Sequence, residues 1–470
     1  MRDFCFGFDG GNLQKSAHLT NNMTNHGYTF DYSKTMMMKL FLSSPNVREG
    51  GSCVNCTFER ALEVIRQTDA LTLGVPKIIY LVGWQYDGHD DKYPAFFEVN
   101  PALKRDSDET PLDSLLWLME QAKKYHTIVS LHINFSDIYD DSPLWDDYVA
   151  AGAVIRDREG KPDPIEQYNG KPCYKVSFKE EWESGLFLSR WNRLCDMIPL
   201  RSIGTVHVDN FLCCYNNCPE VDIAEMQDCR DKILDHLRAE GVDVTSEFPY
   251  REGPAGRETY SHFCMGTTMY PIRCLGRIPA LWWFDNLRDE EYLAYAPSYF
   301  GGGLPHDAAF ADVFYGNIHG EELWLGDKLT SGAWLSDYLR QFCMIQLPYF
   351  LLVGHKRLSV VNHADGTKTV YCADGIVCRG ADKSITQHGI TYKTDRFVSL
   401  PVPWMDGTYL VYADDAGTRR LPLLGAADGE YRISRITAEG LCDSGTAAVT
   451  DGAVEITFVG GDAYVLSPTA

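Results

Sequence analysis

Two acidic residues that end neighbouring apolar segments could share one catalytic cleft. Asp209 ends the segment 205–209, and Glu247 ends the segment 242–247. Their separation of 38 residues (247 − 209) is about one strand–helix–strand step, so both can reach the same edge of a parallel sheet. Such a pair suits glycoside hydrolysis, because one carboxyl protonates the leaving oxygen while the other attacks the sugar or activates water. A pair of solvated or salt-bridged acids is the competing interpretation.

Other polar and aromatic residues follow the same predicted strands and are candidates for binding a ligand. The first strand is followed by Trp84, Gln85, His89 and Asp90, the next ends in His132 and Asn134, and Asn210 follows Asp209. Further along the chain lie Trp282, Trp283, Trp324 and, within the polar segment 312–321, His319. Indole rings can stack on the apolar faces of sugars. Packing in the core is the competing interpretation for each tryptophan.

Three histidines near these strand ends could be either binding residues or hydrogen-bonded core residues. We favour binding for His89 and leave both interpretations open for His132. His207 lies two residues before Asp209, and alternation along a strand puts both side chains on one face. His207 should therefore lie one layer deeper in the core.

Apolar segments alternate with helical segments from about residue 75 onward. Strands are predicted at 77–82, 128–132, 205–209, 242–247 and 280–284, and helices from Pro111, at 180–197 and at 223–240. This alternation is typical of a parallel sheet. Because a glycine-rich dinucleotide motif is missing, an α/β fold of the (β/α)8 TIM-like barrel type is favoured over a doubly wound sheet. We assign the catalytic barrel to residues 71–347.

The segments on either side of the predicted barrel have a different pattern. Residues 1–70 are expected to be an irregular or β segment packed on the barrel, with Thr57 capping a short helix. After residue 347 short β-rich runs are separated by turns that contain Asp-Gly pairs, which favour tight turns. Strands are predicted at 357–361, 368–372, 408–412, 431–436, 453–458 and 463–466. Residues 348–470 are therefore predicted to form an antiparallel β-sandwich.

The order and spacing of several segments resemble one family of glycoside hydrolases. The run from Tyr80 to Asp90 is similar to the first-strand motif of the endo-α-N-acetylgalactosaminidases, glycoside hydrolase family 101. The segments 132–134, 206–209, 245–247 and 347–351 resemble later parts of the same family. The α-N-acetylgalactosaminidases of the related family 129 are similar in fold and chemistry. The resemblance covers about residues 75–355. The extra modules of family 101 have no counterpart in this sequence, so the choice between exo and endo cleavage stays open.

The resemblance implies a role for each matching residue. Asp209 would be the nucleophile that forms a glycosyl-enzyme ester, and Glu247 would act first as acid and then as base. His89 and Asp90 would bind hydroxyl groups of the sugar, with His132 and Asn134 beside them. The other candidate substrate-binding residues are Trp84, Gln85, Asn210, Trp283 and His319.

The composition argues against several classes of partner. Lysine and arginine number 43 against 65 aspartates and glutamates, a net charge of −22, which repels phosphate backbones and anionic lipids. Nucleic acid and membrane partners are therefore not expected, and no segment is long and apolar enough to span a bilayer. The oligomeric state is left open.

The cysteines bear on metals and on location. Cys53 and Cys56 form a lone pair, and Cys213, Cys214 and Cys218 are read as thiols near a strand end, so we expect no metal and no cofactor. The odd number of 15 cysteines, without a signal-peptide pattern, predicts reduced thiols and a cytoplasmic protein.

These observations predict a retaining α-glycosidase. Its substrate would be an α-linked N-acetylgalactosamine-type or galactose-type sugar of a glycan, glycoside or glycopeptide, cleaved through a covalent glycosyl-enzyme. A carbohydrate-binding protein on a degenerate barrel and a metal-dependent barrel hydrolase are the alternatives.

Overall fold

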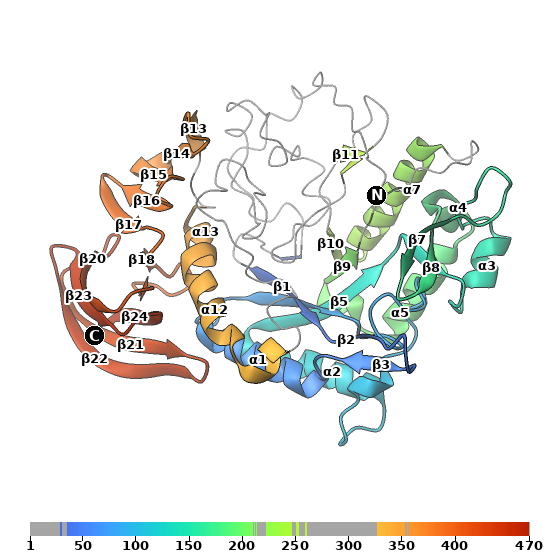
Figure 1. Cartoon of the computed structure of the whole chain (residues 1–470), viewed down its shortest axis with the longest axis horizontal. Helices are drawn as coiled ribbons and strands as arrows, with labels where there is room; N and C mark the ends of the chain where they lie inside the picture. Colours follow the sequence, from blue (N-terminus) through green and yellow to red (C-terminus); the bar gives the residue numbers. More distant parts are fainter. Residues whose placement is uncertain are drawn as a thin grey trace.

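The protein contains two large sheets joined by helices (Figure 1). The computed structural model describes residues 29–30, 35–209, 211, 213, 222–246, 251–252, 259–260, 327–352, 355 and 357–469. Within these ranges, no helix combines the length and apolar character needed to cross a membrane.

The first sheet is parallel and has five strands in the order β1-β4-β5-β9-β10. They are β1 (Met36–Phe41), β4 (Lys77–Val82), β5 (Thr127–Asn134), β9 (Thr205–Asp209) and β10 (Asp243–Ser246). All six residues of β4 are buried, as expected for a parallel strand with both faces covered. Because the pairings are parallel, the carboxyl ends of all five strands lie at the same edge.

Helices connect these strands and cover the sheet. They are α1 (Phe58–Leu71), α2 (Pro111–Ala122), α3 (Trp145–Ala150), α4 (Phe178–Glu183), α5 (Leu186–Met197), α6 (Leu200–Ile203) and α7 (Ile223–Ala239), with short 3-10 turns η2 (Pro101–Leu103) and η3 (Lys123–Tyr125). Local chemistry fixes where they begin: the Thr57 side chain accepts from the backbone N–H of Arg60, and Thr110 forms a capping box with Asp113. The predicted cap at Thr57 is confirmed.

A small antiparallel sheet is inserted after β5 and lies beside its carboxyl end (Figure 1). Its strands, in the order β6-β8-β7, are β6 (Asp137–Tyr139), β7 (Pro164–Tyr168) and β8 (Lys171–Lys175). Two further strand pairs are β2 (Ser43–Pro45) with β3 (Ser52–Val54), and β11 (Arg251–Glu252) with β12 (Thr259–Tyr260).

A run of helices leads into the second large sheet. These are α11 (Asp327–Ser331), α12 (Trp334–Gln341), the π-helical turn η6 (Phe342–Gln346) and α13 (Leu347–Leu352). The sheet has twelve strands in the order β13-β14-β15-β16-β17-β18-β19-β24-β21-β22-β23-β20. Their bounds are β13 (Arg357–Asn362), β14 (Lys368–Cys372), β15 (Ile376–Arg379), β16 (Ser384–Gln387), β17 (Ile390–Lys393), β18 (Phe397–Pro401), β19 (Tyr409–Ala413), β20 (Gly417–Pro422), β21 (Gly429–Thr437), β22 (Gly440–Thr450), β23 (Ala453–Phe458) and β24 (Asp462–Pro468), with a short turn η7 (Ala373–Gly375).

This second sheet curls over its own core. Val411 of β19, Leu421 of β20 and Val454 of β23 share one hydrophobic cluster, although β19 and β20 are far apart in the strand order. Ser399 Oγ of β18 donates to the carbonyl of Pro422 at a distance of 2.6 Å, which brings the edge strand β20 back to β18. The predicted antiparallel strands are present, but they form one continuous rolled sheet instead of two separate sheets.

The five parallel strands agree with part of the predicted barrel. The expected strand at 280–284 lies outside the described residues, so closure of a barrel stays a prediction. The start of the sheet differs from the expected boundary at residue 71, because β1 at Met36–Phe41 pairs with β4 in parallel. The predicted helix at 180–197 is divided into α4 and α5 at Gly185, whose φ of 79° ends a helix.

Candidate functional site

The candidate site lies at the carboxyl edge of the parallel sheet and contains Asp209. This residue is the last of β9 and pairs in register with Asn134, the last residue of β5. Its side chain is 15% exposed, and its Oδ1 lies 4.0 Å from Nε2 of the buried His132. Asp209 is therefore a partly accessible carboxylate at the place where a parallel sheet presents its catalytic groups.

The other predicted catalytic residue, Glu247, lies outside the described residues, and so do Asn210, Trp282, Trp283, His319 and Trp324. The strand before Glu247 is described. β10 ends at Ser246, which pairs in parallel register with Val208 of β9. β10 therefore ends at the same edge of the sheet as Asp209.

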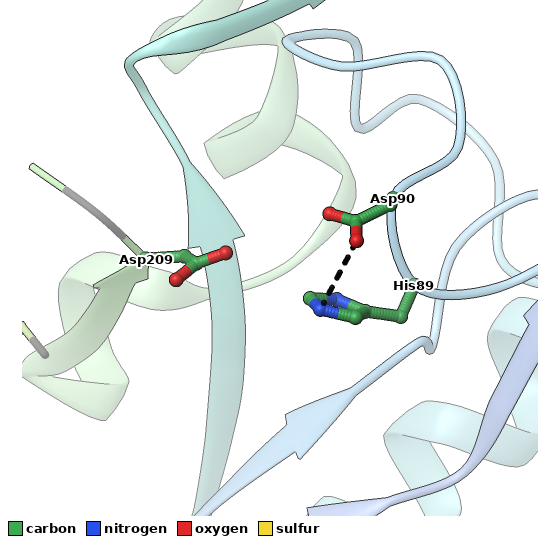
Figure 2. A group of neighbouring side chains, drawn as sticks. All are labelled: His89, Asp90 and Asp209. Atoms are coloured by element: carbon green, nitrogen blue, oxygen red, sulfur yellow. Dashed lines mark ion pairs between the residues drawn. The ribbon is translucent and has the colours of Figure 1, made fainter. Parts of the chain in front are cut away.

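His89 and Asp90 extend toward Asp209 from the loop that follows β4. Figure 2 shows the three side chains converging, and one ligand atom from each lies within 4.8 Å of the others. His89 Nε2 is 3.5 Å from Asp90 Oδ2. The structure thus brings together three residues that the sequence assigned to one site, two as sugar-binding groups and one as the nucleophile.

Close packing holds the loop at residues 83–94 in place. A Cβ at Gly83 would lie 2.0 Å from the carbonyl oxygen of Ser43, and a Cβ at Gly88 would lie 2.6 Å from Cα of Ser44. Only glycine permits such an approach. The loop also holds Asp90 at a φ of 58°, a conformation that costs free energy for a residue with a side chain.

Tyr93 orients both polar residues of this loop. Its hydroxyl oxygen accepts from the backbone N–H of Asp90 at 3.1 Å and lies 3.1 Å from His89 Nδ1. Burial, followed by the nearby negative charges of Asp90 and Asp209, raises the pKa of Tyr93 well above its usual value. A neutral phenol can donate to His89 Nδ1, and a neutral imidazole would then carry its proton on Nε2, on the side of Asp90.

A row of aromatic and imidazole rings in mutual contact connects the site to the core of the sheet. The ring centroids of Tyr80 and His207 are 5.4 Å apart, those of His207 and His132 are 4.9 Å apart, and those of His132 and His89 are 5.3 Å apart. His207 is buried, and its Nδ1 lies 3.0 Å from Thr245 Oγ1. The prediction of a buried, hydrogen-bonded His207 is confirmed, whereas His132 contacts both the core and the site.

The hairpin formed by β7 and β8 holds the loop from the other side. Asn169 Nδ2 in its turn donates to the carbonyl of His89 at 3.0 Å and lies 3.4 Å from that of Asp90. Lys171 Nζ lies 2.9 Å from Asp91 Oδ1 and 2.5 Å from Asp141 Oδ2. Neither residue belongs to a motif that indicates this role, although the Asn169-Gly170 pair is a hairpin-turn signal.

Three of the predicted substrate-binding residues are fully buried. Trp84 stacks on Phe96 at a centroid distance of 5.9 Å and donates from Nε1 to the carbonyl of His132 at 3.0 Å. This indole belongs to the core and offers no face to a sugar, so the expectation of an exposed platform is corrected. Gln85 donates to the carbonyl of Gly88 at 2.6 Å, which stabilises the loop.

Asn134 likewise stabilises the chain where it leaves β5. Its Oδ1 accepts from the backbone N–H groups of Ser136 and Asp137, both at 2.8 Å. Its Nδ2 donates to Asp137 Oδ2 at 2.8 Å. These bonds engage both ends of the amide, so Asn134 shapes the turn after β5 instead of facing a ligand.

The segment that forms this site matches a known family. Residues 48–276 match the family model of the endo-alpha-N-acetylgalactosaminidases. The resemblance to this glycoside hydrolase family is confirmed. The matched segment contains His89, Asp90, His132, Asp209 and Glu247, while similarity to family 129 stays a prediction.

Some solved structures of other proteins are distantly similar to this chain. No curated protein sequence matches the chain significantly. The ligand-free alpha-N-acetylgalactosaminidase NagBb from Bifidobacterium bifidum is 12% identical over 77% of this chain and 58% of its own, with a TM-score of 0.46. The family 36 alpha-galactosidase AgaB from Geobacillus stearothermophilus is 13% identical over 88% of this chain and 53% of its own, with a TM-score of 0.39. The chain thus spans little more than half the length of these structures.

Proposed function

We propose that the chain is a retaining α-glycosidase that removes an α-linked N-acetylgalactosamine-type or galactose-type sugar. The observation that carries the proposal is the convergence of Asp209 with His89 and Asp90 at the carboxyl edge of the parallel sheet (Figure 2). The family match over residues 48–276 supports the same class of reaction.

In the proposed reaction, Asp209 attacks the anomeric carbon of the sugar and Glu247 protonates the departing oxygen. The Asp209–sugar ester forms as the glycosidic bond breaks, and water activated by Glu247 then hydrolyses the ester. A retaining mechanism requires the two carboxyl groups to be about 5–5.5 Å apart. The imidazole of His132, 4.0 Å from Asp209 Oδ1, helps to hold the attacking carboxylate in place.

His89 and Asp90 supply the specificity in this proposal. Asp90 can accept hydrogen bonds from sugar hydroxyls, and His89 can donate from Nε2 while Tyr93 occupies Nδ1. A site built to bond particular hydroxyls rejects sugars that lack them, because its polar groups would then be left unpaired. This suits discrimination among sugars that differ only in the orientation of one hydroxyl.

A substitution at the nucleophile tests the proposal. Asp209→Asn keeps the volume of the side chain but removes its negative charge, so we expect kcat on aryl α-N-acetylgalactosaminides and α-galactosides to fall by at least a thousandfold. Asp106→Asn, at an exposed position that is not among the residues assigned to the site, is the matched control and should keep full activity. Mass spectrometry of wild type with a slow 2-fluoro glycoside should detect a glycosyl ester.

Equal activity of the two variants would contradict the assignment of Asp209. Saturable binding of sugars without turnover in the wild-type protein would instead support the carbohydrate-binding alternative. A panel of aryl α- and β-glycosides, with and without the N-acetyl group, identifies the sugar and the anomer.

The metal-dependent hydrolase is a second candidate, because His89, Asp90 and Asp209 could also ligate a divalent cation. The two candidates differ in their response to chelation. We expect the glycosidase to keep its activity after dialysis against EDTA, since a carboxylate nucleophile needs no metal. Loss of activity that returns only on adding Zn²⁺, Mn²⁺ or Ca²⁺ would favour the second candidate. Repeating the metal addition with Asp90→Asn would then test whether Asp90 is one of the metal ligands.

A further inference from the structure

A cavity of about 270 Å³ lies where α12 and η6 meet the C-terminal sheet. In Figure 1 these helical turns stand between the parallel sheet and the strands β17 and β18. The apolar side of the cavity is formed by Met344 and Ile345, and the rest of its wall carries four basic and two acidic residues. The cavity therefore has a surplus of two positive charges (4 − 2), in a chain whose net charge is −22.

Lys393 is the most deeply buried of these basic residues. Its side chain lies at the end of β17 and the residue is 2% exposed. Nζ donates to the carbonyl of Lys383 at 2.8 Å and to the carbonyl of Thr394 at 3.2 Å. An ammonium group has three donors, so the two carbonyls leave one donor for a ligand.

Three other buried cations in the described part of the chain are each paired with a carboxylate. Lys77 lies 2.6 Å from Asp69, and Lys175 lies 2.6 Å from Asp137. Arg190 is likewise 2.6 Å from Glu181. Among the described residues no carboxylate lies within 4.0 Å of Lys393 Nζ. A buried charge without a counter-ion is costly, so Lys393 differs in this respect from Lys77, Lys175 and Arg190.

The remaining charges of the cavity compensate Lys393 only in part. Arg340 and Asp414 form a two-point ion pair at 2.8 and 3.0 Å and compensate each other. Arg396 is exposed and lies 3.6 Å from Asp415. This leaves Asp395, an exposed acid, as the other carboxylate of the cavity wall.

We propose that this cavity is a binding site for a small oxyanion, a phosphate or sulfate group, which supplies the counter-ion for Lys393. Ammonium and guanidinium groups are the usual protein ligands of such anions. Met344 and Ile345 leave room for an apolar part of the ligand, so a phosphorylated or sulfated monosaccharide fits the same chemistry as the free ion. The site is independent of the glycosidase centre at Asp209.

The protonation of Lys393 gives the site a pH dependence. Burial is the main cause that lowers the pKa of Lys393 to about 8; Cys378 and Asp395 oppose this shift, and Lys383 and Arg340 add to it. An anion binds the charged amine and not the neutral one. Affinity should therefore be full below pH 7 and decline as the pH rises through about 8.

The test is isothermal titration of the full chain with inorganic phosphate, inorganic sulfate and a hexose 6-phosphate, at constant ionic strength in chloride. We expect saturable binding to wild type, weakened at least tenfold in Lys393→Met and severalfold in Arg396→Gln. Arg396 is 59% exposed, so Arg396→Gln serves if Lys393→Met does not fold. Lys123→Met, at a side chain 64% exposed on the parallel-sheet domain, is the matched control.

The three ligands identify the source of the oxyanion. Tighter binding of the hexose phosphate would assign the site to a phosphorylated sugar, and equal binding of all three would assign it to the free ion. No saturable binding to wild type, or equal binding to wild type and both cavity variants, would overturn the proposal. Glycosidase activity is not a readout, so failure here leaves the proposed function untouched.

Discussion

At the scale of single residues, the candidate site is built from side chains that each serve more than one neighbour. Tyr93 is bonded to the backbone of Asp90 and lies within hydrogen-bond distance of His89. His132 lies against His89, His207 and the carboxylate of Asp209. Because these contacts are shared, the polar groups are fixed before a sugar arrives, which lowers the entropic cost of binding and of reaction.

The proposed acid can be tested through the leaving group of the substrate. Glu247→Gln removes the proton that assists departure, so we expect a loss of at least a hundredfold in kcat/KM on alkyl glycosides or natural glycans. The nitrophenolate leaving group needs little protonation, so the kcat/KM for nitrophenyl glycosides, which reports on cleavage of the glycosidic bond, should fall much less. Comparing kcat/KM for the two substrate types in wild type and Glu247→Gln is the measurement. Equal losses on both types would argue that Glu247 is not the acid.

At the scale of elements, the inserted hairpin is a positioning device for the loop that carries His89 and Asp90. Lys171 of β8 reaches Asp91, a buried carboxylate that also accepts from the backbone N–H of Asp87. Asn169 contacts the carbonyls of His89 and Asp90. The hairpin thus connects a sheet outside the parallel core to the residues proposed to recognise the sugar.

Removing the cation of this hairpin should weaken substrate recognition. Lys171→Met leaves Asp91 without its counter-ion, so we expect about a tenfold rise in KM with a smaller change in kcat, and a stability loss of about 1–2 kcal/mol. Lys171→Arg should restore most of the affinity. Lys161→Met, at a side chain 73% exposed, is the control. A lower melting temperature with unchanged KM would mean that the hairpin only stabilises the fold.

The sequence predicted the elements with a strong period better than the contacts between them. Strands β4, β5, β9 and β10 and helices α2 and α7 were recognised because their apolar residues recur at strand or helix spacing. The sequence predicts an irregular or β segment over residues 1–70 but no strand at 36–41, where β1 pairs with β4.

The local pattern could not separate a binding residue from a core residue at the strand ends. Trp84 follows β4 just as a site residue would, and only its stacking on Phe96 places it in the core. Asn169 and Lys171 lie about 80 residues from the loop that they hold, so their role depends on tertiary structure that no short motif contains.

At the scale of the whole molecule, part of the C-terminal sheet shares a hydrophobic core with the parallel sheet, in addition to the core of its own. Trp404 packs on Phe342 and Phe350 and donates from Nε1 to the carbonyl of Leu73 at 3.0 Å. The same hydrophobic cluster contains residues of α1, β4 and β18. The C-terminal sheet therefore packs directly against the elements of the parallel sheet. The cavity lined by Met344, Ile345 and Lys393 lies next to this junction.

The net charge of the chain bears on which substrates the proposed glycosidase would cleave best. A net charge of −22 opposes the approach of polyanionic mucin. We therefore expect aryl α-glycosides and short glycopeptides to be cleaved with a kcat/KM at least equal to that for whole mucin. The measurement compares initial rates of sugar release from both at matched concentrations of glycosidic bonds, at low and high salt. Efficient release of disaccharides from mucin, with no cleavage of the monosaccharide glycosides, would contradict the preference for small substrates.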